Sequence, residues 1–203
     1  LEANGMGDGI ALNDSVFTAN INTVTSLDVA NQSISDLTGI EDFVALTYLQ
    51  CTGNNLTSLD VSNNTALTNL SCGYNQLTSL DVSGATTLSF LNCDNNQLTS
   101  LDVNNNTALT SLYCANNQLT NLDVNNHALL SGLVCNNNQL TSLNVNGAFI
   151  LSILYCSNNQ LISLDVSSNS ALENLACSSN QLISLDVRNG NNWQMLFNAL
   201  NNP

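Results

Sequence analysis

Cysteine is the residue type with the clearest chemical potential in this sequence, because its spacing is strictly regular. Thiols can pair as disulfides, bind metals or act as nucleophiles. If all seven share one inward strand position, their Cβ atoms are spaced like parallel strands, about 4.8 Å apart. A disulfide needs a Cβ–Cβ distance of about 3.8 Å and Cβ atoms that point in different directions from these, and a zinc site needs ligands that converge as a tetrahedron. We therefore predict a ladder of free, buried thiols. The cysteines recur every 21 residues, at Cys51, Cys72, Cys93, Cys114, Cys135, Cys156 and Cys177.

A row of carboxylates follows the same period. Carboxylates about 5 Å apart repel one another unless something compensates their charge. Local backbone N–H groups of the following turn are the favoured compensation, and bound Ca²⁺ is the alternative. Asp8 and Asp14, near the start, offer the same two alternatives, capping or Ca²⁺. The row consists of Asp60, Asp81, Asp102, Asp123, Asp165 and Asp186, and it is interrupted by Asn144.

Catalytic residues are scarce. His127 is the only histidine, and it takes the position that Asn64 and Asn106 hold in other repeats, which predicts a solvated turn residue. No Ser–His–Asp or Cys–His arrangement is available, because the cysteines face inward and His127 is distant from the concave face. The Asp row follows a regular strand rather than a cleft, which disfavours a glycosidase carboxylate pair. We predict that the chain is not an enzyme.

The elements that position these residues follow from residues 67–77, which read L-x-x-L-x-C-x-x-N-x-L. This is the leucine-rich repeat pattern, with Cys at the third apolar position. Leu70 and Cys72 are two residues apart, so both point inward from a strand. Asn75 is then buried, where its amide can both donate to and accept from the backbone at the turn. The sequence predicts a leucine-rich repeat solenoid with a parallel β-sheet on its concave face, short strands or turns on its convex face and few helices.

Four segments make up the chain. Residues 1–23 are predicted to be a truncated N-terminal cap, and 24–45 a 22-residue repeat with a 3₁₀-like turn. Residues 46–192 hold seven 21-residue cysteine repeats, and 193–203 begin a divergent C-terminal repeat or cap. Trp193, in place of a repeat leucine, is expected to cover the end of the stack. Leu196 is aligned with the repeat leucine, Asn198 with the cysteine and Asn201 with the buried asparagine. We expect a fragment of a longer chain, continuing beyond Pro203.

Charge narrows the possible partners. The net charge is −14, Lys is absent and Arg188 is the only arginine. Nucleic acids and anionic membrane surfaces both require clustered positive charge, so neither is an expected partner. No apolar run reaches the roughly 18 residues of a membrane-spanning helix, so membrane insertion is not expected.

A binding surface is predicted on the concave face, where outward positions vary while the rest of the repeat is nearly constant. Exposed apolar residues grouped in this way mark contacts, and the polar neighbours are suited to sugars as well as to proteins. Packing between neighbours along the sheet is the alternative explanation. The predicted patch consists of Phe90, Tyr113, Val134, Ile153 and Tyr155, with Asn92, Asp94 and Asn136 beside it.

A row of threonines also faces outward. Regular threonine arrays on flat β-faces are similar to ice-binding surfaces, although the adjoining Asp row argues against that role. The row consists of Thr57, Thr78, Thr99, Thr120 and Thr141.

The repeat resembles known leucine-rich repeat families over essentially the whole chain. The cysteine at a 21-residue period is similar to internalin J-type repeats of Gram-positive surface adhesins. The segment Cys93-Asp94-Asn95-Asn96-Gln97-Leu98 and the start Leu1-Glu2-Ala3-Asn4-Gly5 resemble secreted surface proteins of Bacteroidota. The resemblance implies a secreted or cell-surface location and supplies no catalytic residues.

These observations favour a non-catalytic recognition or adhesion module of a bacterial surface protein, binding a protein partner through the concave face. A carbohydrate-binding accessory region of a larger secreted enzyme is the first alternative. A structural or filament-forming repeat protein that associates end to end is the second, and ice binding is the third.

Overall fold

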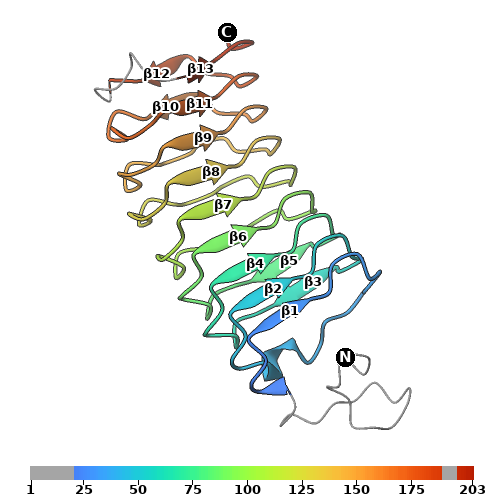
Figure 1. Cartoon of the computed structure of the whole chain (residues 1–203). Helices are drawn as coiled ribbons and strands as arrows, with labels where there is room; N and C mark the ends of the chain where they lie inside the picture. Colours follow the sequence, from blue (N-terminus) through green and yellow to red (C-terminus); the bar gives the residue numbers. More distant parts are fainter. Residues whose placement is uncertain (1–20, 189–195) are drawn as a thin grey trace.

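The computed structural model describes residues 21–188 and 196–203. In these residues the chain winds into a stack of coils, and each coil contributes one three-residue strand to a nine-stranded parallel sheet (Figure 1). Parallel strands need a long connection, and here the rest of each coil supplies it. This main sheet consists, in spatial order, of β1 (Ser26–Asp28), β2 (Tyr48–Gln50), β4 (Asn69–Ser71), β6 (Phe90–Asn92), β7 (Ser111–Tyr113), β8 (Gly132–Val134), β9 (Ile153–Tyr155), β11 (Asn174–Ala176) and β13 (Leu196–Asn198).

The opposite side of the stack carries shorter ladders. Strand β3 (Ser58–Asp60) pairs with β5 (Ser79–Asp81), and β10 (Ser163–Asp165) pairs with β12 (Ser184–Asp186). Between these two pairs, the described residues contain a single isolated bridge, from Asp123 to Asn144. The predicted short strands on the convex side are therefore present at both ends of the stack. A 3₁₀ helix, η2 (Ile40–Asp42), lies in the first repeat, where the spacing of apolar residues predicted a turn of this kind.

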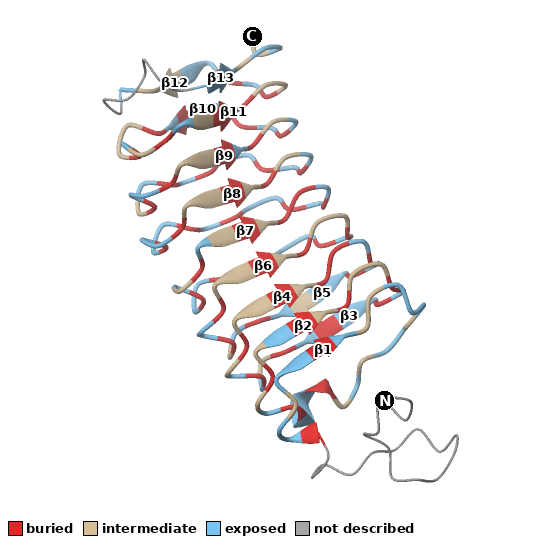
Figure 2. Cartoon of the chain, viewed as in Figure 1, coloured by how far each residue is buried: buried red, intermediate tan, exposed pale blue. Residues whose placement is uncertain are grey.

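One continuous core fills the coils. The middle residue of nearly every main-sheet strand is buried, while the residues on either side of it face outward (Figure 2). Leu70, Leu91 and Leu112 have no solvent exposure, and the cysteine two residues after each of them is equally buried. The alternation of polar and apolar residues in each strand thus decides which side faces the core.

A buried asparagine closes each turn after the main strand. Asn75 donates from Nδ2 to the carbonyls of Cys51 and Cys72, at 3.0 and 3.1 Å. Its Oδ1 accepts the backbone N–H of Leu56 at 3.0 Å. The predicted pairing of the asparagine with turn backbone is therefore present, and it repeats along the stack at Asn96, Asn117, Asn138, Asn159 and Asn180.

The last coil differs from its predicted alignment by one residue. Leu175 pairs with Phe197, and Ala176 pairs with Asn198, so this step is 22 residues long. The carbonyl of Cys177 and the N–H of Leu182 are bound by Asn202. The alignment of Leu196, Asn198 and Asn201 with the repeat was wrong, because the pattern was extended at a constant 21 residues. Asp8, Asp14 and Trp193 lie outside the described residues.

Candidate functional site

The main sheet brings the predicted patch together. Strand register places Phe90, Ser111, Gly132 and Ile153 in one column across β6, β7, β8 and β9. The next column runs through Asn92, Tyr113, Val134 and Tyr155 in the same strands. All five apolar members of the patch therefore lie on four adjacent strands in the middle of the sheet (Figure 1).

Packing between the side chains is strongest at one end of the patch. The rings of Phe90 and Tyr113 have centroids 5.6 Å apart and are tilted by 43°. This diagonal contact leaves both rings half-buried, as are Val134 and Ile153, whereas Tyr155 is 38% exposed. Packing along the sheet and exposure to a partner are therefore both features of this face.

The first column lacks a side chain at Gly132, in β8. A Cβ atom at this position would have one neighbour within 4 Å, the Ser111 Oγ at 3.9 Å. The open position is bordered by Ile153 in its own column and by Val134 two residues along its strand. The missing side chain leaves an open position on this face, which we call the recess.

The polar members of the patch are held by the backbone. Asn92 Oδ1 accepts the N–H of Asp94 at 3.0 Å, and a carboxylate oxygen of Asp94 accepts the N–H of Ala115 at 2.5 Å. Burial raises the pKa of the Asp94 carboxyl, and the hydrogen bond from Ala115 opposes this shift. Asp94 is thus a fixed carboxylate at the rim of the sheet face. Asn136, in the next column, accepts the Asn116 N–H at its backbone oxygen.

The Asp row makes the local hydrogen bonds that were predicted for it. Each member accepts the backbone N–H of the residue two positions later, at 2.8–3.1 Å, and Asn144 does the same. The hydroxyl and N–H of Ser83 lower the pKa of Asp81, and those of Ser167 do so for Asp165. The guanidinium of Arg188 lowers the pKa of Asp186 to about 2. These interactions stabilise the ionised forms of Asp81, Asp165 and Asp186, each within its own coil.

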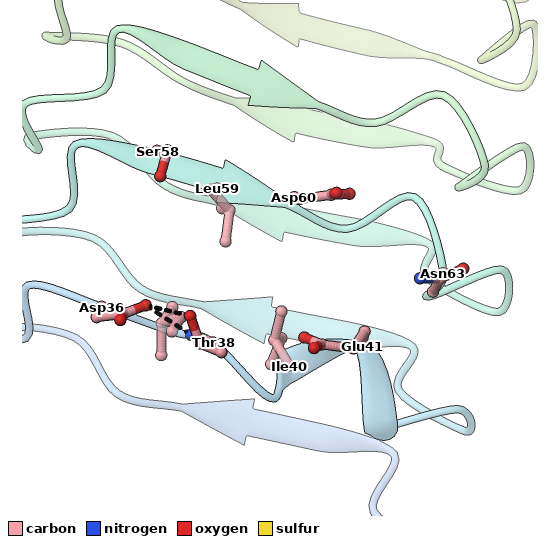
Figure 3. A pocket seen from close by; sticks show the side chains of 9 residues that line it. Asp36, Thr38, Ile40, Glu41, Ser58, Leu59, Asp60 and Asn63 are labelled. Atoms are coloured by element: carbon pink, nitrogen blue, oxygen red, sulfur yellow. Dashed lines mark hydrogen bonds between the residues drawn. The ribbon is translucent and has the colours of Figure 1, made fainter.

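A pocket of about 270 Å³ lies beside this row, between the first repeat and β3 (Figure 3). Its carboxylates already accept local bonds: Asp36 from the N–H and hydroxyl of Thr38, at 2.8 and 2.7 Å, and Glu41 from the N–H of Gly39 at 2.9 Å. Among the described residues, no three His, Cys, Asp or Glu side chains are grouped to hold a metal ion. The described chain likewise has no helix long and apolar enough to cross a membrane.

All seven cysteines are buried and free. Burial raises the pKa of every thiol, to about 12 for Cys51 and Cys135 and to about 11 for Cys177. Because the thiolate is the reactive form, the ladder acts as a set of small apolar side chains rather than as nucleophiles.

His127 is not the solvated turn residue that the sequence predicted. Its side chain has no solvent exposure, and Nε2 lies 3.1 Å from the carbonyl of Val103 in the preceding coil. Asn64, Asn106 and Asn169 are equally buried in the same column. The prediction failed because asparagine was interpreted as a surface residue, although Ala85 and Ala148 share the column and mark it as inward.

Two features of the surface were missed. Tyr74 has φ 53° and is 65% exposed, in a column that otherwise holds Gly, Asn and Ser. A hydroxyl ladder precedes the main strands, where each side chain donates to the carbonyl of its counterpart in the preceding coil at 2.9–3.1 Å. Alignment of the repeats by column would have shown both. The ladder donors are Thr47, Thr68, Ser89, Thr110, Ser131 and Ser152.

Comparison with known proteins agrees with this architecture. The family model for the endo-β-N-acetylglucosaminidase EndoS LRR domain matches residues 18–117. An internalin, inlF of Listeria monocytogenes strain 4b F2365, is 30% identical with a TM-score of 0.72, over 83% of this chain and 56% of that one. The chain has the leucine-rich repeat fold. A further leucine-rich repeat structure, from Leptospira interrogans, is 24% identical with a TM-score of 0.79, over 91% of this chain and 51% of that one, and confirms the predicted fold class.

The leucine-rich repeats also resemble a curated relative. Internalin J of Listeria monocytogenes serotype 4b (strain F2365) is 52% identical over 52 residues, which are 26% of this chain and 6% of that protein. The predicted resemblance to internalin J is thereby confirmed. The chain spans only a small part of this relative and about half of each solved structure.

Proposed function

We propose that this leucine-rich repeat chain is a non-catalytic recognition module of a secreted or cell-surface bacterial protein. It binds a protein partner through the outward face of β6, β7, β8 and β9. The observation that carries the proposal is the mixed face on these strands, where Phe90, Tyr113 and Tyr155 share the outward surface with the open position at Gly132. Aromatic side chains on a rigid scaffold are typical of interface centres.

The regularity of the scaffold supports this proposal. Inward positions repeat the same Leu, Cys and Asn in coil after coil, whereas the outward columns of the main sheet change from strand to strand. The stability of the coils does not require Tyr at 113 or 155, because other coils place Ser, Gln or Ala in that column. Packing alone does not explain why these outward residues differ from coil to coil, whereas binding to a partner does.

Carbohydrate binding is the second candidate, in which the chain is an accessory region of a larger secreted enzyme. The family model named for an endo-β-N-acetylglucosaminidase supports it. Tyrosine faces beside Asn92 and Asp94 provide both a stacking surface and hydrogen-bonding groups for a sugar ring.

A binding screen against bacterial and host surface proteins and a glycan array tests both candidates. The variants are Tyr113→Ala/Tyr155→Ala, which removes the aromatic rings, and Gly132→Val, which fills the recess with a β-branched residue suited to a strand. Ile162→Thr/Ile183→Thr is the matched control, because Thr fills that column in five other coils. We expect both sheet variants to lose binding and the control to retain it. Binding that survives both sheet variants would overturn the proposed site, and binding to glycans alone would favour the second candidate.

A further inference from the structure

A band without charged side chains crosses the molecule. Residues 124–164 contain no Asp, Glu, Lys or Arg, although the chain carries a net charge of −14. The one histidine in the band, His127, is buried. Because the band spans almost two 21-residue coils, and each coil passes once around the stack, its uncharged surface encircles the molecule. On the convex side the band is uncharged because Asn144 takes the place of an aspartate in the Asp row.

Exposed apolar side chains gather inside this band, on the edge loops that lead into β8 and β9. We call Leu129, Phe149 and Ile150 the edge patch; they are 52, 58 and 49% exposed. Leu129 and Ile150 occupy the same position in successive coils, and the other described coils have small or polar residues there. Those residues are Ala45, Ala66, Thr87, Ala108 and Ala171.

The edge patch is continuous with the main-sheet face. Leu129 stands three residues before Gly132, the first residue of β8, and Ile150 stands three residues before Ile153, the first residue of β9. Strands β8 and β9 pair in register, so the two loops approach the sheet side by side (Figure 1). One surface therefore extends from the recess at Gly132 around the edge of the sheet.

The charges that border the band are all acidic. Asp94 and Asp123 precede it and Asp165 and Glu173 follow it, while Arg188, the only cation of the described chain, pairs with Asp186. Interface centres are depleted in charge and enriched in aromatic and large apolar residues, and their rims are polar. A second copy of this chain would place carboxylates against carboxylates, which disfavours self-association through this surface.

We propose that the edge patch and the adjoining face of β8 and β9 form one contact for a protein segment with an apolar centre flanked by Lys and Arg. The sheet part of this contact rests on the proposed function, and the edge part is independent of it. The apolar centre covers the part of the uncharged band that carries the edge patch and the face of β8 and β9, and the basic flanks meet the acidic borders.

Three synthetic peptides test this proposal by fluorescence anisotropy. The first has a Leu/Trp centre between Lys/Arg flanks, the second has the same centre between Asp/Glu flanks, and the third has a Gly/Ser centre between Lys/Arg flanks. The edge variant is Leu129→Ala/Phe149→Thr/Ile150→Ala, which installs residues that other coils hold in these columns. Ile162→Thr/Ile183→Thr, at the opposite edge just before β10 and β12, removes comparable exposed apolar area as the control.

We expect the first peptide to bind best, and the edge variant to weaken it by about tenfold or more, as loss of central interface residues does. The control variant should bind it unchanged. Equal binding of the three peptides, or an edge variant that binds as well as the wild type, would overturn the proposal. The variant Tyr113→Ala/Tyr155→Ala separates the two proposals. Loss of peptide binding in that variant alone supports the sheet site and rejects the edge contact. Loss of peptide binding in the edge variant alone supports the edge contact and rejects the sheet site.

Discussion

The side-chain amide of Asn117 donates a hydrogen bond to the carbonyl of Cys93, which lies 3.0 Å away in the preceding coil. The same amide reaches the carbonyl of Cys114 at 3.2 Å, and Asn117 Oδ1 accepts the N–H of Leu98 at 3.0 Å. One buried side chain thereby satisfies backbone groups of two coils at the turn after the main strand.

Replacing this asparagine should destabilise the stack. In Asn117→Ala, the buried N–H of Leu98 loses its partner, which costs about 1–3 kcal/mol. The carbonyls of Cys93 and Cys114 each lose one of two amide donors, because the asparagines of the neighbouring coils still bind them. We expect the free energy of unfolding to fall by about 3 kcal/mol in urea titrations followed by circular dichroism. Asn125→Ala, at an exposed turn position, is the control and should change little. Equal effects of the two substitutions would contradict the role of the buried ladder.

His127→Asn should stabilise the protein. Asn106 donates to two carbonyls of the preceding coil, at 2.9 and 2.8 Å, whereas His127 has one such contact. Each side chain leaves one buried polar atom without a partner, Asn106 Oδ1 and His127 Nδ1, so the difference between them is the second hydrogen bond. Restoring the asparagine adds one buried hydrogen bond, worth about 1 kcal/mol. Thermal unfolding of both proteins measures the difference, and a lower midpoint for the variant would refute the prediction. His127→Ala, which matches Ala85 and Ala148, separates the hydrogen bond from side-chain size.

Asp94 and Asp81 should influence the pH dependence of stability in opposite directions. Burial raises the pKa of Asp94, so the folded state binds its proton more tightly than the unfolded state, and stability is lost as pH rises through the folded pKa. Hydrogen bonds from Ser83 lower the pKa of Asp81, so its contribution is present above the ordinary value of 3.8 and is lost as pH falls through the folded pKa.

Urea midpoints of the two isosteric variants across the acid range check this pair. At about pH 7 we expect Asp94→Asn to be more stable than the wild type and Asp81→Asn to be less stable. Both differences should shrink as the carboxyls are protonated at lower pH. Two variants that shift stability in the same direction would show that the Asp94 environment has been misjudged.

The thiol ladder should resist alkylation in the folded protein. Burial keeps the thiols protonated, with a pKa of about 12 at Cys135 and about 11 at Cys177. We expect iodoacetamide at about pH 8 to modify the folded chain slowly and Cys177 first, because the end of a stack opens most easily. Peptide mass spectrometry locates the label, and the chain unfolded in guanidinium chloride, where all seven should react, is the control. Rapid labelling of Cys114 in the folded state would disprove the buried ladder.

The fold was predictable because the period itself specifies it. A spacing of two between Leu70 and Cys72 defines the strand, and the recurrence of the cysteine every 21 residues defines the coil. The Asp row was also predictable, since a carboxylate followed by a turn binds its own backbone. These are local relationships, and they repeat without reference to the rest of the molecule.

The remaining errors arose where a position departs from its column. Asn202 binds the carbonyl of Cys177, although counting from Asn180 selects Asn201. A coil that is one residue longer changes every later assignment, and the sequence alone does not reveal where the added residue is absorbed. The edge patch was not predicted, for a different reason. Leu129 and Ile150 form one patch only because their loops lie side by side at the edge of the sheet, and the structure is needed to show this.

The ladders that join neighbouring coils also bear on how such a chain can change over evolutionary time. The side chains of Asn96, Asn117 and Asn138 each bind only the coil before them and their own coil. Duplication or deletion of a whole 21-residue unit by unequal recombination therefore re-forms every one of these bonds with a new neighbour. The gene can lengthen or shorten in fixed steps, and each added step supplies a fresh set of outward positions on which selection acts.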